Sequence, residues 1–420
     1  MSYSIPRGTY DILPKDSYRW QALKAKFTEL AKAFGYEEIT TPIFEVSDLF
    51  ERSSGESSDV VQKEMYRFTD KKGRSFALRP EGTAPVVRAY VEHNMASSGN
   101  NKLWYWGPMF RYDRPQAGRY RQFYQYGLEF IGSDNPYWDA ELISFLWLFL
   151  SGLGLKHLRL ELNSVGCPNC SQDYDNALRA YFQPHLESLC PDCQKRYETK
   201  PRRLLDCKVT TCKQIAGSAP SQLDYLDEPC RDHFAAAKSY LDKLSIPYTI
   251  NPKIVRGLDY YTNTAFEIVY EGIGAQNSLA GGGRYNGLIE QIGGKPTPAI
   301  GFAGGIERLL IALENEGISL GESPGTDLYL IPMGEQARDF ILPWINRWRM
   351  EGITIGFDPD KSSFKSQLKA ANNSQARFAA IIGEDELAQE SVMLKDMQSG
   401  EQSLIKLSEL VSTLKTKLNH

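Results

Sequence analysis

The stretch from Gly107 to Phe130, GPMFRYDRPQAGRYRQFYQYGLEF, predicts two strands joined by a short loop. Aromatic residues favour strands on both sides of residues 113–119, where Pro115 and Gly118 are typical of a turn. Side chains alternate between the two faces of a strand. One face of the second strand is therefore bulky and apolar, and the other is mostly polar. The polar face consists of Arg121, Phe123, Gln125, Gly127 and Glu129.

This polar face predicts the floor of a ligand-binding site. Arg121, and Arg111 at the end of the first strand, would face an anionic group, while Phe123 offers a flat surface. Glu129 would face a cationic group, and Gly127 leaves room between them. The pattern therefore favours a ligand that is anionic at one end, planar in the middle and cationic at the other. For this stretch alone, a half-exposed strand with ordinary ion pairs is the alternative.

Length and composition indicate a globular protein of two or three domains. The chain has 420 residues, and a domain typically has about 150. Hydrophobic residues at 42% and charged residues at 24% are ordinary for a soluble protein, and the net charge of −4 does not indicate a nucleic-acid binder. No signal peptide is visible, and the most apolar run, 142–150, is shorter than the roughly 20 residues of a membrane helix. We expect a cytoplasmic protein without a membrane partner.

The residues before the central stretch predict elements that could frame a site. We expect an amphipathic helix over 15–34, a strand over 36–44 that contains Pro42, and a hairpin over 65–79. Glu81, Gly82 and Thr83 then place a carboxylate, an open backbone and a hydroxyl at a strand-to-helix junction. Such junctions often bind ligands, and an ordinary helix cap is the alternative.

All 7 cysteines lie between Cys167 and Cys230, in a segment that predicts helices over 177–189 and 231–244. Two Cys-x2-Cys pairs at this spacing are typical of a structural zinc site, and the candidate ligands are Cys167, Cys170, Cys190 and Cys193. Buried or free thiols in an accessory helical module are the alternative.

The second half of the chain contains three glycine-rich or tyrosine-rich segments. They are 255–261 (VRGLDYY), 278–287 (SLAGGGRYNG) and 299–313, where Gly304-Gly305 precedes a helix that carries Arg308. Glycine lets ligands approach the backbone, and a helix start with an arginine favours phosphate. After a linker over 317–325, alternating strands and helices predict a small α/β domain: 328–332, 335–351, 353–357, 362–372 and 378–383.

Together these segments resemble the bacterial histidyl-tRNA synthetases, over essentially the whole chain. The three class II synthetase motifs match the helix and strand ending at Pro42, the stretch 107–130, and 301–309 (GFAGGIERL). Two histidine-specific signatures are sharper: 256–261 (RGLDYY) and 280–285 (AGGGRY).

The resemblance implies an α+β fold and a homodimer. It implies a class II catalytic core of antiparallel sheet and flanking helices over 1–166 and 246–322. It places the cysteine-bearing helical insertion at 167–245 and an α/β anticodon-binding domain at 326–420.

The implied activity is the ATP-dependent attachment of L-histidine to tRNA(His) through a histidyl-adenylate, with release of AMP and pyrophosphate. Magnesium would bridge the ATP phosphates. From the cysteine spacing alone, and not from the resemblance, we expect that a zinc ion in the insertion would be structural. Arg256 and Arg111 would be catalytic. The implied ATP-binding residues are Arg111, Arg119, Arg121, Phe123 and Arg308.

The same resemblance implies the residues that bind the other two substrates. Those for histidine are Glu81, Gly82, Thr83, Gln125, Glu129, Tyr260, Tyr261 and Tyr285. Arg114 and Gln116 would approach the tRNA acceptor end. Two positions depart from the family pattern: Asp113 stands where Glu is more frequent, and Asn286 stands where Asp is usual. We expect neither to abolish activity.

Other functions remain open from the sequence. The first is a synthetase-like regulatory subunit of histidine biosynthesis, but such proteins typically lack the C-terminal domain and the phosphate-binding arginines, and Arg111, Arg256 and Arg308 are present here. The second is a sensor of uncharged tRNA without ATP turnover. The third is a class II synthetase for another amino acid, against which the two signatures argue.

Overall fold

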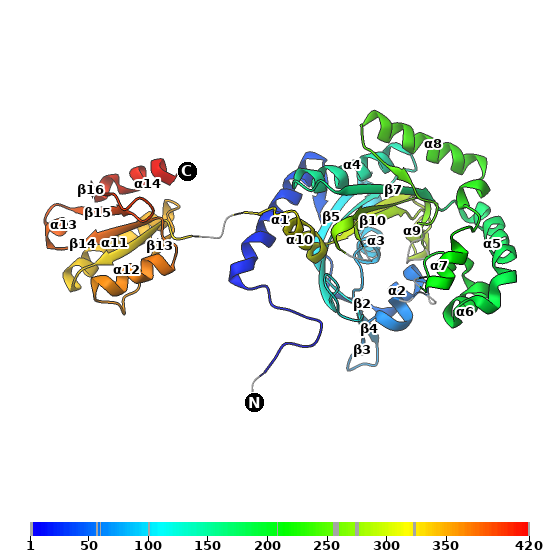
Figure 1. The fold of residues 1–420 in the computed structure, drawn as a ribbon, viewed down its shortest axis with the longest axis horizontal. Coiled ribbons are helices and arrows are strands. Elements are labelled where there is room, and N and C mark those ends of the chain that lie inside the picture. Colours follow the sequence, from blue (N-terminus) through cyan, green and yellow to red (C-terminus); the bar gives the residue numbers. More distant parts are fainter. Residues whose placement is uncertain are drawn as a thin grey trace. The chain divides into compact units, whose positions relative to one another are not determined.

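The computed structural model describes residues 3–55, 58, 60–99, 101–207, 209–254, 260–273, 277–321 and 325–418. Contacts divide the chain into two units (Figure 1). The first contains residues 1–13 and 20–320, and the second contains residues 14–19 and 321–420. In the part of the chain that the structure describes, no helix has both the length and the apolar surface of a membrane span.

A mixed, chiefly antiparallel sheet of eight strands forms the centre of the first unit (Figure 1). Among the strand pairs of this sheet that the described residues form, the edge pairs β1–β5 and β7–β8 are parallel and the others antiparallel. The predicted antiparallel sheet is confirmed, with a short parallel strand at each edge. In spatial order the strands are β1 (Glu37–Glu38), β5 (Asn101–Phe110), β6 (Gln122–Ile131), β11 (Ala299–Gly305), β10 (Ser278–Arg284), β9 (Thr262–Tyr270), β7 (Leu158–Ser164) and β8 (Thr249–Ile250).

The apolar face of the sheet is buried against helices. Helices α1 (Pro14–Ala33), α4 (Tyr137–Gly152) and α10 (Ile306–Asn315) share one hydrophobic core with the strands. Phe27 of α1 lies at the centre, with its ring centroid 5.3 Å from that of Tyr126 and 5.0 Å from that of Phe149. Tyr126 belongs to the face of β6 that was predicted to be apolar, and that prediction is confirmed. The opposite face of β6 is left for a site.

The predicted strand over 36–44 is wrong, because the structure divides it. Its first residues form β1, and Phe44 begins β2 (Phe44–Val46), which belongs to another sheet. Pro42 lies between them and has no N–H to continue a ladder.

The second sheet has three strands, in the order β2, β4 (Ser75–Leu78) and β3 (Arg67–Thr69), so the predicted hairpin is confirmed. Neighbouring short elements are α2 (Ser47–Ser54), a π-helix (Val60–Glu64), α3 (Thr83–Glu92), a 3-10 helix (Met95–Ser98) and α9 (Leu288–Gln291).

The insertion is helical, as predicted, but its first helix begins earlier than the prediction of 177. Cys167 is the N-cap of α5, Pro168 takes the first helical position, and Pro184 lies at the start of the 3-10 turn that follows the helix. The elements are α5 (Pro168–Phe182), a 3-10 helix (Gln183–Ser188), α6 (Pro191–Thr199), a 3-10 helix (Pro201–Leu204), α7 (Thr210–Ala216), a 3-10 helix (Gln222–Tyr225) and α8 (Glu228–Lys243).

The second unit is an α/β domain with a five-stranded sheet in the order β13-β12-β14-β15-β16. Its first five elements occur where the sequence predicts them, and two antiparallel strands and two helices follow. The elements are β12 (Leu328–Pro332), α11 (Glu335–Met350), β13 (Ile355–Gly356), α12 (Phe364–Asn373), β14 (Phe378–Ile382), α13 (Glu384–Ala388), β15 (Ser391–Asp396), β16 (Gln402–Lys406) and α14 (Leu410–Leu418).

Candidate active site

A cavity of about 440 Å³ opens on the polar face of the large sheet. Strands β6, β9, β10 and β11 contribute to it, together with the 111–120 loop and the start of α10. The cavity therefore collects side chains from segments that are far apart in the sequence. The predicted site residues that line it are Glu81, Thr83, Arg111, Arg119, Phe123, Gln125, Tyr260, Tyr261 and Arg308.

Strand register explains why β6 and β11 can form a floor with little bulk. Gly301 pairs with Glu129, and Gly305 pairs with Gln125, so small residues on β11 stand beside functional side chains on β6. A Cβ on Gly301 would lie 1.7 Å from Oε2 of Glu129. A side chain at position 301 would displace the Glu129 carboxyl group, so the glycine there lets this group occupy its place.

Three arginines, Arg111, Arg119 and Arg308, converge at one end of the cavity. Arg111 donates from Nε to the carbonyl of Pro80 at 2.8 Å, and its guanidinium lies 5.4 Å from the Phe123 ring centroid. Arg308 donates to the carbonyls of Gly118 and Ser278 at 3.3 and 3.0 Å.

The electrostatics of this end favour an anion. Burial lowers the pKa of Arg308, and the positive charges of Arg119 and Arg111 lower it further. Arg119 is partly neutralised by an ion pair of 2.6 Å with Asp113. Like charges that are held together at the wall of a cavity are stabilised by a polyanionic ligand.

A buried carboxyl group lies behind the other end of the cavity. Glu129 is completely buried, and it accepts hydrogen bonds from Thr83 Oγ1 at 2.7 Å and from the Tyr285 hydroxyl at 2.5 Å. Burial raises the pKa of Glu129 to about 8, although these two hydrogen bonds act in the opposite direction. The predicted pairing of a carboxyl group with a tyrosine hydroxyl is present next to the cavity, because Thr83, which lines it, bonds to the same carboxyl group.

Glu81 is fixed at the start of α3 by backbone donors. Its carboxylate accepts from the backbone N–H groups of Thr83 and Ala84 at 2.6 and 2.9 Å. Burial raises the pKa of Glu81, against those hydrogen bonds. The cap suggested as an alternative from the sequence is therefore present, yet the same side chain lines the cavity. One carboxyl group thus serves the helix start and faces a ligand.

Gln125 supplies an amide with unused hydrogen-bonding capacity. The residue is 9% exposed, and its Oε1 atom has no hydrogen-bond partner among the described residues. Buried polar atoms are normally paired. A donor group of a bound ligand would satisfy this oxygen.

Not every predicted site residue lines the cavity. Gly82 lies against Tyr105, because a Cβ there would be 2.2 Å from that ring. Arg121 instead stacks over the Tyr112 ring at 3.9 Å. Arg114 and Gln116 are exposed in the 111–120 loop. Arg256 lies outside the described residues.

Sequence reasoning missed three acidic residues that line the cavity: Asp206, Glu267 and Glu307. Glu307 is 7% exposed and accepts from the Tyr10 hydroxyl at 2.6 Å and from the backbone N–H of Tyr124 at 2.8 Å. Burial raises the pKa of Glu307 to about 6. Its position next to Arg308 at a helix start was the available signal. Asp206 had none, because only the tertiary fold brings the insertion to the cavity.

Replacing Glu307 by glutamine should change how stability depends on pH. The folded pKa of about 6 exceeds the ordinary value of 4.5, so the folded state binds more protons between these pH values. The Glu307 carboxyl group therefore lowers the free energy of unfolding as pH rises through this window, with a slope of at most about 1.4 kcal/mol per pH unit. Denaturation at a series of pH values should give the free energy of unfolding of Glu307→Gln minus that of wild type. We expect this difference to increase from pH ~4.5 to ~6 and then to stay constant. A difference that does not change with pH would contradict the prediction.

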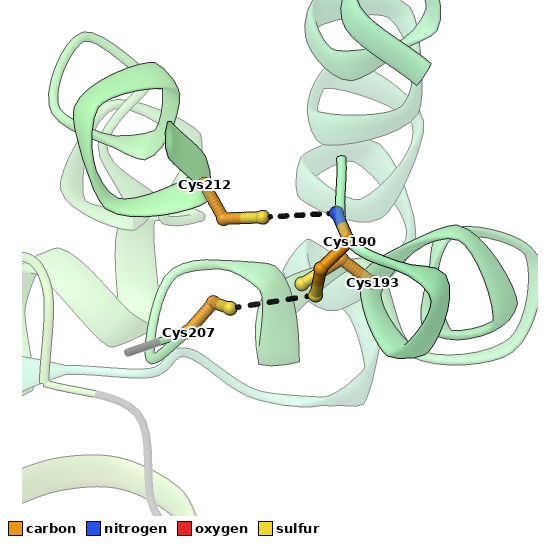
Figure 2. Close-up of side chains that lie close together, drawn as sticks. All are labelled: Cys190, Cys193, Cys207 and Cys212. Atoms are coloured by element: carbon orange, nitrogen blue, oxygen red, sulfur yellow. Dashed lines mark hydrogen bonds between the residues drawn. The ribbon is translucent and has the colours of Figure 1, made fainter. Parts of the chain in front are cut away.

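The structure assigns the two Cys-x2-Cys pairs to different clusters and does not combine them in one site. The distal cluster is Cys190, Cys193, Cys207 and Cys212 (Figure 2). The basal cluster is Cys167, Cys170, Asp227 and Cys230. The ligand atoms within each cluster lie within 4.8 Å of one another. The sequence signal for metal ligands was present, but the spacing did not reveal how they are grouped.

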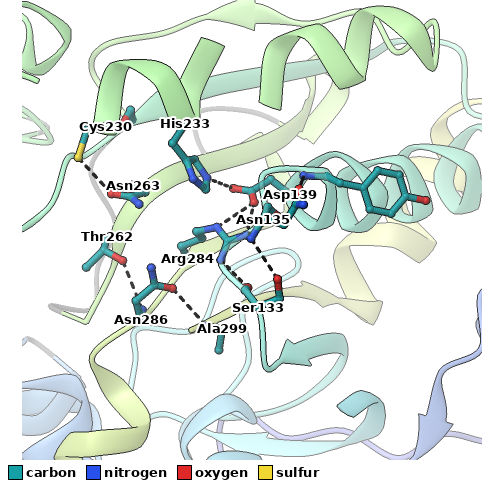
Figure 3. Close-up of polar contacts among 12 residues, drawn as sticks. Ser133, Asn135, Asp139, Cys230, His233, Thr262, Asn263, Arg284, Asn286 and Ala299 are labelled. Carbon is teal, nitrogen blue, oxygen red and sulfur yellow. Dashed lines mark hydrogen bonds and ion pairs between the residues drawn. The ribbon is translucent and has the colours of Figure 1, made fainter. Parts of the chain in front are cut away.

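A buried ion pair lies between the insertion and the site strands (Figure 3). Arg284 and Asp139 are completely buried, with Nη2 and Oδ2 2.5 Å apart, and His233 of α8 lies 3.1 Å from the other carboxylate oxygen. Burial acts to raise the pKa of Asp139, but Arg284 and His233 outweigh it and hold that pKa below its usual range. Arg284 directly precedes Tyr285, so this network fixes the strand end that carries the Tyr285 hydroxyl.

Asn286, which departs from the aspartate usual in the family, accepts a hydrogen bond from the backbone N–H of Ala299 at 3.2 Å. An aspartate at this position could accept the same bond.

Comparison with known proteins agrees with this geometry. A family model described as histidyl-tRNA synthetase matches residues 8–309, and one described as an anticodon binding domain matches residues 327–417. A curated histidine–tRNA ligase of Caldanaerobacter subterraneus is 47% identical over 416 residues, which cover 99% of this chain and 100% of the relative. One of Bacillus velezensis is 49% identical over 419 residues and 99% of each chain. The crystal structure of apo histidyl-tRNA synthetase from S. aureus has a TM-score of 0.84 and 43% identity, and it covers 99% of this chain and 100% of that one.

Proposed function

Because the chain belongs to the histidyl-tRNA synthetase family, we propose that it joins L-histidine to tRNA(His) in two steps at the cavity described above. The carboxylate of histidine attacks the α-phosphate of ATP and expels pyrophosphate, which gives histidyl-adenylate. The terminal ribose of the tRNA then accepts the histidyl group, and AMP leaves.

One observation supports this assignment most strongly: the two ends of one cavity have opposite chemistry. Arg111, Arg119 and Arg308 converge at one end, whereas Glu81 and Gln125 line the other, above the buried Glu129. ATP and histidine have complementary groups, since the phosphates are anionic and the α-amino group is cationic. Their reacting groups would meet between the two ends, and holding them there supplies most of the catalysis in phosphoryl chemistry.

We assign the phosphates and the adenine to the arginine end. Arg111 would contact the α-phosphate, Arg308 the γ-phosphate, and Phe123 would stack on adenine. Arginine suits phosphate because its planar group donates two parallel hydrogen bonds. Arg119 lies at the wall of the cavity and joins this group. We assign a role at the reacting phosphate and carboxylate to Arg256.

Magnesium would accompany ATP and neutralise charge on the phosphates. This cation prefers oxygen ligands and is usually held by substrate phosphates with one or two carboxylates. Glu267 and Glu307 line the cavity and fit that donor set. The cysteine clusters take no part in the reaction that we propose.

Histidine would be recognised from its two polar ends. Glu81, Thr83 and Gln125 would bind the α-amino group, and the unpaired Gln125 oxygen is available for it. Glu129 and Tyr285, with Tyr261, would recognise the imidazole. A neutral imidazole presents one donor and one acceptor, so a carboxyl group bonded to a tyrosine hydroxyl can satisfy both. Tyr260 packs its ring 4.8 Å from that of Tyr261 and supports it.

The remaining parts of the chain would bind tRNA or a second subunit. The exposed Arg114 and Gln116 would approach the acceptor end, and residues 326–420 would bind the anticodon. We also propose a cytoplasmic homodimer. Its interface would include exposed apolar side chains around the three-stranded sheet, at Ile43, Phe44 and Phe68. Light scattering that gives a monomer at micromolar concentration would contradict the dimer.

The regulatory-subunit alternative is not favoured. The relatives at 47–49% identity over the full length are named as ligases. The chain also has the domain that matches the anticodon-binding model and the arginines of the cavity. A regulatory protein would need neither.

The decisive test is ATP–pyrophosphate exchange with each of the twenty amino acids. We expect exchange with L-histidine only, because the site pairs a carboxyl group with a tyrosine hydroxyl, and a neutral imidazole offers a donor and an acceptor to such a pair. Exchange with another amino acid instead would overturn the substrate assignment. Histidine binding by calorimetry without any exchange would overturn the enzymatic function and favour the regulatory subunit.

A further inference from the structure

The spacing of the sulfur atoms in both cysteine clusters is that of a metal site. Thiolates around a tetrahedral zinc ion, with Zn–S bonds of ~2.3 Å, lie about 3.8 Å apart. In the distal cluster, Sγ of Cys190 lies 3.8 Å from Sγ of Cys207 (Figure 2). In the basal cluster, Sγ of Cys170 lies 3.6 Å from Sγ of Cys167 and 3.8 Å from Sγ of Cys230. Asp227 Oδ2 lies 3.1 Å from Cys167 Sγ and offers a fourth ligand.

Backbone donors to sulfur support the same conclusion. The N–H of Cys190 donates to Sγ of Cys212 at 3.2 Å, and the N–H of Cys167 donates to Sγ of Cys170 at 3.1 Å. Hydrogen bonds of this kind orient metal ligands and stabilise their negative charge. Both clusters therefore have the second layer of contacts that a thiolate site needs.

The distal part of the insertion is built from short helices around a small core. Its helices α6 and α7 have only 9 and 7 residues, well below the roughly 12–15 that an isolated helix requires. Its hydrophobic cluster itself includes Cys193, Cys207 and Cys212 among the buried residues. A small module with a limited core is commonly held together by a structural metal.

We propose that the insertion binds two zinc ions, one in the distal cluster and one in the basal cluster, and that the basal ion positions the histidine end of the active site. Four thiolates form a closed structural zinc site, and zinc also binds carboxylate oxygen, so the three thiolates and one carboxylate of the basal cluster likewise supply four donors. All 7 cysteines of the chain are used in the two sites.

The basal cluster occupies the two ends of the insertion. Cys167 is the N-cap of α5, just after β7, and Asp227 is the N-cap of α8, where the chain returns toward the sheet. A metal here would join the first and last helices of the insertion, so it would fix the orientation of α8.

Two side chains of helix α8, Cys230 and His233, reach neighbouring elements of the first unit (Figure 3). Cys230 Sγ lies 3.4 Å from Oδ1 of Asn263, on the strand that follows Tyr261, and a metal-bound thiolate here would accept a hydrogen bond from the Asn263 side-chain NH2 once the amide turns over. One turn further along α8, His233 lies 3.1 Å from Asp139, which is paired with Arg284. The next residue, Tyr285, donates to Glu129. Loss of the basal ion would loosen both connections and disturb the imidazole-binding end before the arginine end.

Metal analysis of untreated, desalted wild-type protein should find two zinc ions per chain. Cys212→Ser and Cys230→Ser should each retain one ion, and cobalt substitution should give tetrahedral thiolate spectra in both. Zinc absent from wild type, a single ion, or iron instead of zinc would overturn the two-site proposal.

A milder pair of variants tests the positioning role. Asp227→Asn keeps an N-cap residue but loses the carboxylate ligand, so chelator competition should show basal affinity reduced by more than the about 10- to 100-fold that the loss of an outer-shell partner costs. Asp224→Asn, an exposed neighbour outside both clusters, is the matched control and should behave as wild type.

A chelator concentration can be chosen at which Asp227→Asn loses its basal ion while wild type and Asp224→Asn keep both ions. Under this condition we expect the KM of Asp227→Asn for histidine in pyrophosphate exchange to rise about 2- to 30-fold. The KM for ATP should stay unchanged, and added zinc should restore the histidine value. An unchanged histidine KM would overturn the positioning role. This role rests on the proposed function. If no amino acid supports exchange, that function fails, whereas the zinc content still decides the two-site proposal.

Discussion

Replacing Arg111 by alanine is expected to lower ATP–pyrophosphate exchange by about 10²- to 10³-fold, the usual cost of removing one donor to a developing charge. Arg111 lines the cavity and is held by the Pro80 carbonyl, so its guanidinium is oriented before ATP binds. The loss should appear mainly in kcat, because the α-phosphate gains charge in the transition state. Arg111→Lys should recover only part of it, since lysine cannot donate two parallel bonds.

The matched control for this prediction is Arg114→Ala. Arg114 lies three residues away and is exposed, so it should leave pyrophosphate exchange unchanged and impair only the transfer to tRNA. Circular dichroism would verify that both variants fold. Equal losses of exchange in the two variants would show that the positive charge of the loop, and not the position of Arg111, matters.

The second large effect is expected at the imidazole-binding end. Glu129→Gln should lower kcat/KM for histidine by about 10²- to 10³-fold while ATP binding is retained, because a buried site built for hydrogen bonding tolerates unpaired groups poorly. Glutamine keeps the shape of glutamate, but its NH2 group would oppose the hydroxyl donors of Thr83 or Tyr285. Tyr285→Phe should show a smaller loss of the same kind.

Tyr126→Phe is the control for the tyrosine variant. Tyr126 lies on the core face of the same strand as Glu129, is completely buried, and has a hydroxyl without a hydrogen-bond partner among the described residues. Removing that hydroxyl should leave activity unchanged. If Tyr126→Phe and Tyr285→Phe lose histidine activity equally, the assignment of Tyr285 to substrate recognition is wrong.

Local sequence patterns predicted much of the fold because they depend on neighbours in the chain. The alternation of β6 follows from the geometry of any strand, so its polar and apolar faces could be assigned without a structure. The same holds for α1 and for the alternating elements of the second unit. The prediction of one continuous strand through Pro42 was wrong, because local patterns do not show which sheet a short extended segment joins. That choice depends on partners that are distant in the sequence.

The candidate site was also partly predictable, because arginines, glycines and tyrosines were concentrated in recognisable segments. The sequence by itself determined the chemical types in the cavity and the presence of metal-type cysteine pairs. Only the tertiary structure decided which of these groups meet. It buried Glu129 against Tyr285, brought Asp206 and Glu307 to the cavity, turned Arg121 toward Tyr112, and assigned the cysteine pairs to separate clusters. The physical reason is that the sequence specifies local geometry and side-chain chemistry, whereas contacts between distant segments depend on how sheet register and helix packing bury the whole chain.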